Sequence, residues 1–99
     1  MWINKPWLDE PDEFESQGAN WHIEIIPINK ITGIGWATNE TRKSIEKAWR
    51  NNQKVPLVLI EKLEDGPYEL QDGQHRFAAY KRVFPNAKRL KAAVFTRGI

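Results

Sequence analysis

The sequence predicts a small single-domain α+β protein with a mixed sheet and two main helices. Three observations support this prediction. The chain has 99 residues, which is enough for one modest core. Two segments place apolar residues at helical spacing, and four short segments are rich in β-branched or aromatic residues. The order of these segments along the chain is strand, helix, strand, strand, helix, strand.

Residues 1–20 are predicted to form an irregular, acidic, tryptophan-containing arm that precedes a domain spanning residues 21–99. The arm carries two prolines, one glycine and five acidic residues, which disfavour regular structure. Its large aromatic residues, among them Trp2, Trp7 and Phe14, are expected to dock on the domain or on a second copy of the chain. A protein partner or a homodimer contact through this arm is therefore one expectation.

The first strand is expected over 21–28, where isoleucines partly alternate with polar residues. The first helix begins at Thr38 or Asn39, because either side chain can cap a helix and Glu40 then lies in the first turn. Apolar residues at helical spacing continue this helix to about Asn51.

The second half of the chain contains three further strands and one helix. The nearly continuous apolar run 55–60 predicts a buried strand, and the turn at 64–67 returns the chain into a hairpin partner at 68–71. The apolar stripe over 73–84 predicts the second helix, and residues 91–96 supply the last strand.

The junction between strand 68–71 and helix 73–84 is the most informative feature of the sequence. It reads Asp72-Gly73-Gln74-His75-Arg76. A strand that stops at glycine and continues as a helix leaves backbone N–H groups without partners at the positive end of the helix dipole. His75 and Arg76 add side-chain donors to the same turn. This combination favours binding of an anion, most plausibly a phosphate.

Two segments resemble the ParB/sulfiredoxin superfamily. Residues 26–31 are similar to the opening strand of ParB-type domains, and residues 72–80 are similar to the central motif of the superfamily. The matching stretch reads Gly-Cys-His-Arg in sulfiredoxins, Gly-Glu-Arg-Arg in ParB proteins and Asp-Gly-His-His-Arg in free-serine kinases of the same fold. The similarity covers roughly residues 22–96 and implies this fold with a nucleotide-phosphate site.

The resemblance also implies which residues form that site. It assigns cofactor binding to the matching motif, joined by a basic residue early in the first helix: Gly73, Gln74, His75, Arg76, and Arg42 or Lys43. Gln74 stands where sulfiredoxins carry cysteine, so reduction of a sulfinic acid is excluded by chemistry. His75 replaces the first arginine of the ParB motif.

Asp72 is the first candidate for catalysis and for metal binding. It could cap the second helix, or it could hold Mg²⁺ and accept a proton from an attacking hydroxyl group. A carboxylate beside a phosphate repels it unless a metal lies between them, so the catalytic role is tied to Mg²⁺. Glu40 is the second catalytic candidate. With two histidines and no cysteine, the sequence disfavours a transition-metal site.

A loop with two glycines, Gly33 and Gly35, precedes the first helix and carries Trp36. The indole ring of Trp36 could stack on a nucleotide base. The alternative is that Trp36 packs into the core.

Charge is distributed unevenly along the chain, although the net charge is only +2. Residues 73–99 contain no acid, and this basic C-terminal third could face DNA. The simpler alternative is a solvated helix face followed by a basic tail. The bases concerned are Arg76, Lys81, Arg82, Lys88, Arg89, Lys91 and Arg97.

The function favoured by the sequence is nucleotide-phosphate binding with ATP, ADP or CTP and Mg²⁺, as a phosphotransferase or an NTPase. The alternatives are a DNA-binding or ParB-like nuclease module, and a non-catalytic plasmid- or phage-borne module that binds a protein. No apolar run approaches the roughly 20 residues that span a bilayer. No membrane partner and a cytoplasmic location are therefore expected, and the absence of cysteine is consistent with this.

Overall fold

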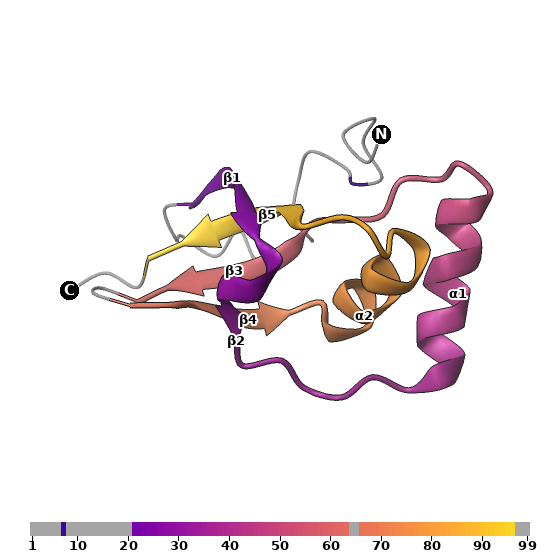
Figure 1. The fold of residues 1–99 in the computed structure, drawn as a ribbon, viewed down its shortest axis with the longest axis horizontal. Coiled ribbons are helices and arrows are strands. Elements are labelled where there is room, and N and C mark those ends of the chain that lie inside the picture. The colour runs from indigo at the N-terminus through magenta and orange to yellow at the C-terminus, as the bar shows by residue number, and fades with distance from the viewer. Residues whose placement is uncertain (1–6, 8–20, 64–65, 97–99) are drawn as a thin grey trace.

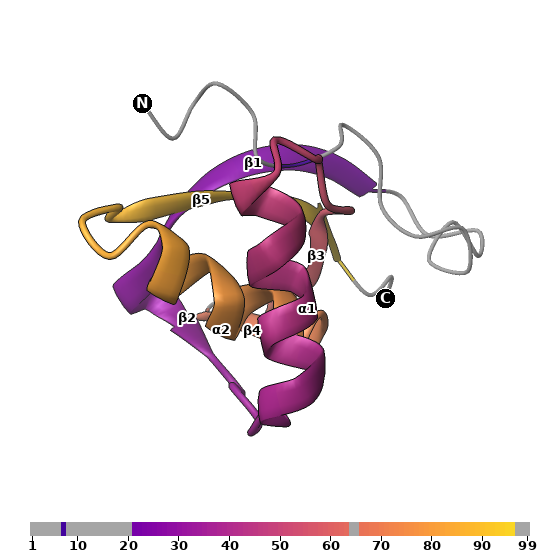
Figure 2. The same cartoon turned by 90° about the vertical axis from the view of Figure 1, so that its right-hand side faces the viewer.

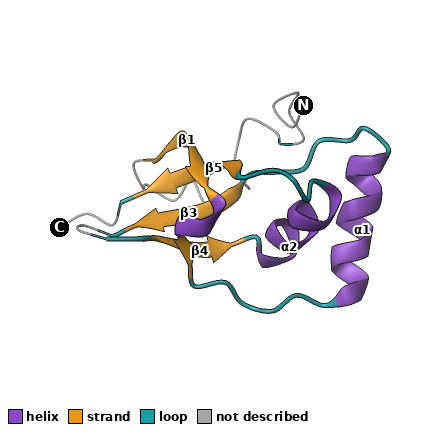
Figure 3. Cartoon of the chain, in the orientation of Figure 1, coloured by secondary structure: helices purple, strands orange, loops and turns teal. Residues whose placement is uncertain are grey.

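The computed structural model describes Trp7 and residues 21–63 and 66–96 of the chain. Five strands, two α-helices and one short 3₁₀ helix follow one another in this part (Figures 1 and 3). In chain order they are β1 (Trp21–Pro27), the 3₁₀ helix (Ile28–Lys30), β2 (Ile31–Thr32), α1 (Asn39–Arg50), β3 (Val58–Lys62), β4 (Tyr68–Asp72), α2 (Gln74–Val83) and β5 (Arg89–Phe95).

The five strands form one mixed sheet in the order β1-β5-β3-β4-β2. The pairs β1–β5 and β3–β4 are antiparallel, whereas β3–β5 and β2–β4 are parallel. The β3–β4 pair is the hairpin that the sequence predicted. The predicted α+β class, with a mixed sheet and two main helices, is confirmed.

Three details of the sheet differ from the sequence prediction. Strand β5 begins at Arg89, two residues before its predicted start. Strand β3 begins at Val58 rather than at Val55. The proline at position 56 has no N–H group to donate to a neighbouring strand, and Val55 instead forms an isolated parallel bridge with Trp7. Strand β2 was not predicted, because a strand of two residues is too short to show an alternating pattern.

The two helices pack side by side near one end of the sheet. Helix α2 lies next to the sheet, and α1 lies on the far side of α2 (Figures 1 and 2). No helix in the described part of the chain is both long enough and apolar enough to cross a membrane.

A cluster of aromatic side chains joins the helices to the N-terminal segment. Trp7 is completely buried and packs edge-on against Trp49 of α1, with ring centroids 4.9 Å apart. It also contacts Tyr80 of α2, with ring centroids 5.2 Å apart. One tryptophan of the predicted arm therefore docks on the domain, while Trp2 and Phe14 lie outside the described residues. The division into an arm and a domain at residue 20 stays a prediction.

Candidate functional site

The turn between β4 and α2 requires glycine at position 73 for two separate reasons. Gly73 has φ = 103°, in the left-handed region that favours glycine. A Cβ atom at this position would also lie 2.9 Å from the Cγ1 atom of Val58. The turn is therefore tightly packed against β3, as expected for a motif that fixes the start of a helix.

Helix α2 begins without a side-chain cap. Its first hydrogen bond runs from the Phe77 N–H group to the Gly73 carbonyl oxygen, at 2.8 Å. The N–H groups of Gln74, His75 and Arg76 consequently have no acceptor within the helix. These groups carry the positive end of the helix dipole, so this end of α2 favours an anion.

Arg76 connects the turn to the segment that leads into β3. Its Nη1 atom donates to the carbonyl oxygens of Pro56 and Leu57, at 3.2 and 2.9 Å. Its Nη2 atom donates to Asp72 at 2.9 Å, and its side chain is 11% exposed. Asp72 therefore does not cap α2, which was one of its two expected roles, and forms an ion pair with Arg76 instead. The guanidinium group of Arg76 therefore already donates three hydrogen bonds to oxygen atoms of the protein.

A cleft of about 320 Å³ opens beside this turn. The whole motif lines it, from Asp72 to Arg76, so the structure brings together five residues that the sequence singled out. The remaining lining residues come from α1 and from the segment before β3, and none of them was predicted to line a site: Thr41, Ile45, Val55 and Pro56. The spacing of Thr41 and Ile45, four residues apart on one helix face, is the signal that could have indicated the α1 wall.

The N-termini of the two helices meet at the cleft. The Nε2 atom of His75 lies 3.3 Å from the Oγ1 atom of Thr38, the residue that precedes α1. The opposite ends of the helices also meet, because the rings of Trp49 and Phe84 are 5.8 Å apart. The helices thus run in the same direction, and their positive dipole ends lie together.

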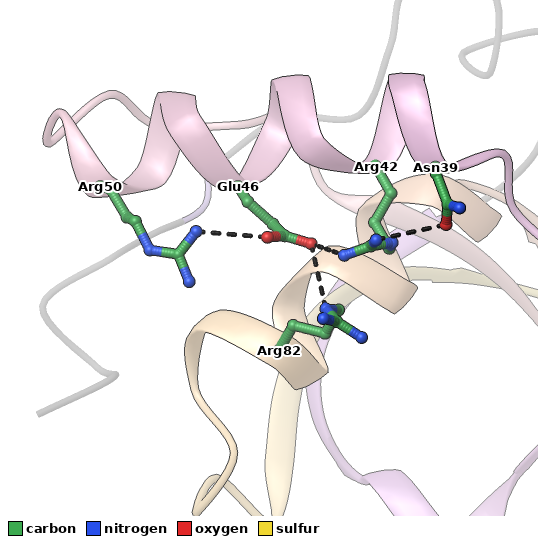
Figure 4. A network of polar contacts seen from close by, with 5 residues as sticks. All are labelled: Asn39, Arg42, Glu46, Arg50 and Arg82. Carbon is green, nitrogen blue, oxygen red and sulfur yellow. Dashed lines mark hydrogen bonds and ion pairs between the residues drawn. The ribbon is translucent and has the colours of Figure 1, made fainter.

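The other predicted site residues lie outside the described lining of this cleft. Glu40 and Lys43 are exposed on α1. Arg42 is buried and pairs with Glu46 on the next turn, and its Nη2 atom donates to Asn39 at 3.3 Å (Figure 4).

Trp36 is 83% exposed, so the alternative that placed it in the core is wrong. Its neighbour Gly35 packs close to Gln74, since a Cβ atom at position 35 would lie 3.4 Å from the Cγ atom of Gln74. The loop that carries Trp36 therefore touches the start of α2.

The described residues contain no group of three or more histidine, cysteine or acidic side chains placed to hold a metal ion. Asp72 is the one acidic residue in the described lining of the cleft. Mg²⁺ commonly binds through one or two carboxylates together with phosphate oxygens and water. The cleft is therefore better suited to a Mg²⁺ ion that is held partly by a phosphate ligand than to one held by protein groups alone.

Comparison with solved structures finds the same arrangement of elements. The chain superposes on sulfiredoxin from Arabidopsis thaliana with a TM-score of 0.62 and 16% sequence identity, over 77% of this chain and 86% of that one. It superposes on a pNOB8-like ParB N-domain with a TM-score of 0.58 and 20% identity. A second crystal form of that domain gives a TM-score of 0.57, also at 20% identity.

The ParB matches cover 80% of this chain but only 29% and 31% of the ParB chains, so this chain spans about a third of their length. No family model matches the sequence, and no curated protein does. At these identities the solved structures establish the fold and nothing of the activity. This agrees with the resemblance that the motif from Asp72 to Arg76 indicated: the chain has the ParB/sulfiredoxin-like fold.

Proposed function

We propose that the cleft binds the phosphate groups of a nucleotide. The observation that supports this most directly is the start of α2, which has no side-chain cap and lines an open cleft. Backbone N–H groups at a helix N-terminus bind phosphate through hydrogen bonds and through the helix dipole. The adjacent N-terminus of α1 adds a second dipole of the same sign.

The donors for a phosphate group come from four places on the cleft wall. They are the N–H groups of Gln74 and His75, the imidazole ring of His75 and the hydroxyl group of Thr41. Arg76 contributes its positive charge, while the contacts it makes to Pro56 and Leu57 give it the role of bracing the turn. Asp72 opposes phosphate binding, but its ion pair with Arg76 offsets part of its negative charge.

The contacts to a phosphate group alone supply too little binding free energy for tight binding of the ligand. A helix N-terminus contributes about 0.3–1 kcal/mol, and about 2 kcal/mol when it is partly buried. A hydrogen bond to a charged group adds about 1.5–3 kcal/mol. After the cost of association, inorganic phosphate alone would bind with about millimolar affinity. A ligand with a base and a ribose gains additional contacts.

In this proposal Trp36 is the residue that contacts the base. Its indole ring is exposed, and the neighbouring Gly35 packs close to Gln74, which lines the cleft. Stacking of a base on an aromatic side chain contributes about 1–3 kcal/mol. This contact would raise the affinity for a nucleotide above that for its isolated phosphate groups.

Asp72 is the residue that would hold Mg²⁺ beside the phosphate groups. When bound there, the ion would neutralise charge on the phosphate oxygens. It would also relieve the repulsion between these oxygens and the Asp72 carboxylate. Mg²⁺ is therefore expected to strengthen nucleotide binding, and Asp72→Asn is expected to remove this dependence on Mg²⁺.

Isothermal titration calorimetry of the full chain with ATP, ADP and CTP, with and without Mg²⁺, tests the proposal. His75→Ala is expected to weaken binding about 10- to 100-fold, the equivalent of one lost charge-assisted hydrogen bond. His22→Ala is the matched control, because His22 is the other histidine of the chain and lies on β1. Absence of heat with all three nucleotides, or equal effects of the two substitutions, would refute phosphate binding in the cleft.

Substitution of Trp36 separates the contact to the base from the contacts to phosphate. Trp36→Ala is expected to weaken nucleotide binding about 5- to 150-fold, which corresponds to about 1–3 kcal/mol of lost stacking. It is expected to leave the binding of inorganic triphosphate unchanged. Equal losses for both ligands would show that Trp36 acts on the cleft in another way.

A further inference from the structure

A cluster of charged side chains lies where α1 packs against α2, and none of its members is in the described lining of the cleft. At its centre is Glu46, whose carboxylate contacts three arginines (Figure 4). Arg42 and Arg50 lie one turn before and one turn after it on α1. Arg82 approaches from α2, with its Nε atom 3.5 Å from the Glu46 Oε2 atom.

One carboxylate cannot neutralise three guanidinium groups, so the cluster carries a net charge of +2. The Arg42–Glu46 pair is buried, with side chains 10% and 9% exposed. Arg50 and Arg82 are the outer members, with side chains 58% and 63% exposed. The contacts to Glu46 hold these two outer arginines in position while most of their surface faces the solvent.

Two lysines extend the positive surface along α1. Lys43 and Lys47 are exposed, and together with Arg50 they follow the spacing i, i+4, i+7 that defines one face of a helix. Glu40 is the one exposed acidic residue on α1, and it lies three residues before Lys43 on the same side of the helix, so it lowers the net charge of this surface by one. Thr41 and Ile45, which line the cleft, belong to a different face of the same helix. We call the set formed by Lys43, Lys47, Arg50 and Arg82 the basic helix face.

The chemistry of the basic helix face matches a row of phosphate groups. Arginine presents a planar fork that pairs with phosphate oxygens, and the fixed positions of Arg50 and Arg82 reduce the entropy lost on binding. In the described residues, the exposed aromatic side chain is that of Trp36, in the loop before α1, so the face offers no ring for stacking. Single-stranded nucleic acids depend on such stacking, whereas a duplex can bind through its backbone alone.

We propose that the basic helix face binds the phosphate backbone of duplex nucleic acid without reading its sequence. This inference does not depend on nucleotide binding in the cleft, since it concerns a different face of α1. Three residues of this face, Lys43, Lys47 and Arg50, precede the basic C-terminal third considered from the sequence, and Arg82 belongs to it. Four phosphate contacts predict that log K falls with log salt concentration with a slope of about −3 to −4.

Filter binding of the full chain to a labelled 20-base-pair DNA duplex over a series of salt concentrations tests this inference. The double variant Lys43→Gln/Lys47→Gln is expected to reduce the magnitude of the salt slope by about 2. The control is Lys30→Gln/Lys62→Gln, which removes the same charge from the 3₁₀ helix and from the end of β3. The control is expected to keep the slope of the parent chain, and circular dichroism checks that both variants fold.

Several outcomes would overturn the inference. These are no retention of the duplex at 50 mM salt, equal changes in the two double variants, or tighter binding to vesicles with anionic headgroups than to the duplex. Saturating ATP is expected to leave duplex binding unchanged. Loss of duplex binding on addition of ATP would instead assign the DNA to the cleft and contradict binding at the basic helix face.

Discussion

At the scale of single residues, the sheet holds one carboxylate in its charged form. Burial disfavours the charged form of Glu24, but hydrogen bonds from His22 and Tyr68 outweigh this effect, and the pKa of Glu24 lies below its ordinary value. The Tyr68 hydroxyl donates to Glu24 at 2.9 Å, and the His22 Nε2 atom lies 2.5 Å from the same carboxylate. The hydrogen bond from Tyr68 connects β4 to β1, which are not neighbours in the sheet.

The substitution Tyr68→Phe is expected to raise the pKa of Glu24 toward its ordinary value. Because the folded-state pKa is lowered, Glu24 stabilises the fold at pH values above its unfolded-state pKa, and this stabilisation is lost as the pH falls through the folded-state pKa. The variant should therefore lose less stability than the parent chain on acidification through this range. NMR titration of the Glu24 side chain and urea unfolding at several pH values measure the two effects. An unchanged pKa of Glu24 would contradict the assigned role of Tyr68.

Gly73 is the residue of the motif whose backbone conformation and close packing disfavour any larger side chain. Gly73→Ala is expected to destabilise the fold by about 1–2 kcal/mol from the left-handed backbone alone, with an added cost from the contact with Val58. Gly66→Ala is the control, because a Cβ atom there meets Leu63 at an ordinary 3.7 Å. Urea unfolding of the two variants measures the difference, and equal stabilities would show that the turn adapts to a side chain.

At this scale the sequence predicted that the residues of the motif lie together, because they are contiguous. Gly73, Gln74 and His75 share one turn, so their common placement follows from local geometry. The role of Arg76 was less predictable, since it depends on the carbonyl oxygens of Pro56 and Leu57, about twenty residues earlier in the chain. The proximity of Thr38 to His75 likewise depends on how the two helices pack.

At the scale of elements, α1 is amphipathic in an unusual way, because its buried side includes a charged pair. Arg42 and Glu46 lie between α1 and α2 together with the apolar Trp49. The resemblance implied that a basic residue early in this helix, Arg42 or Lys43, joins the ligand site. The structure gives Arg42 an ion pair with Glu46 and a hydrogen bond to Asn39. No sequence pattern distinguishes a buried arginine of this kind from an exposed one.

The substitution Glu46→Ala is expected to destabilise the fold by about 3–5 kcal/mol, because it leaves the buried Arg42 side chain without its charged partner. Glu40→Ala is the matched control on the same helix, and the exposed position of Glu40 predicts a change within about 0.5 kcal/mol. Chemical unfolding monitored by circular dichroism measures both. A loss below about 1 kcal/mol in Glu46→Ala would mean that Arg42 finds water or another acceptor.

The length of each strand decided how well it could be predicted from the sequence. Strands β1, β4 and β5 were found because each is long enough to show alternation or an apolar run. The start of β3 was placed too early, since Val55 is as apolar as the strand that follows Pro56. Strand β2 is defined by its parallel pairing with β4, and a contact between segments so far apart in the chain leaves no pattern in the local sequence.

At the scale of the whole molecule, the described core extends beyond the segment predicted to form the domain. Trp7 fills a position between α1 and α2 and forms a bridge with Val55. The substitution Trp7→Ala is expected to cost about 3–5 kcal/mol, as other large aromatic residues do when they are removed from a core. Trp36→Ala, at an exposed position, is the control and should change stability by less than about 0.5 kcal/mol.

Urea unfolding measures both tryptophan variants. Equal stabilities of Trp7→Ala and the parent chain would show that residue 7 is dispensable for the core. The burial of Trp7 also limits the use of an arm truncation as a test of partner binding. Deletion of residues 1–18 removes Trp7 together with the acidic arm, so a loss of partner binding could result from a weakened fold. Substitution of arm residues with Trp7 kept in place avoids this ambiguity.

The unequal surroundings of the tryptophans give the chain an internal optical reporter. Trp7 and Trp49 are buried in the aromatic cluster, whereas Trp36 is largely exposed to water. Emission from an indole shifts to longer wavelength in a polar environment, and dissolved quenchers reach an exposed ring first. The quenchable, red-shifted part of the emission should therefore come largely from Trp36 among the described tryptophans. A molecule that settles over this loop would shield that signal without labelling the protein.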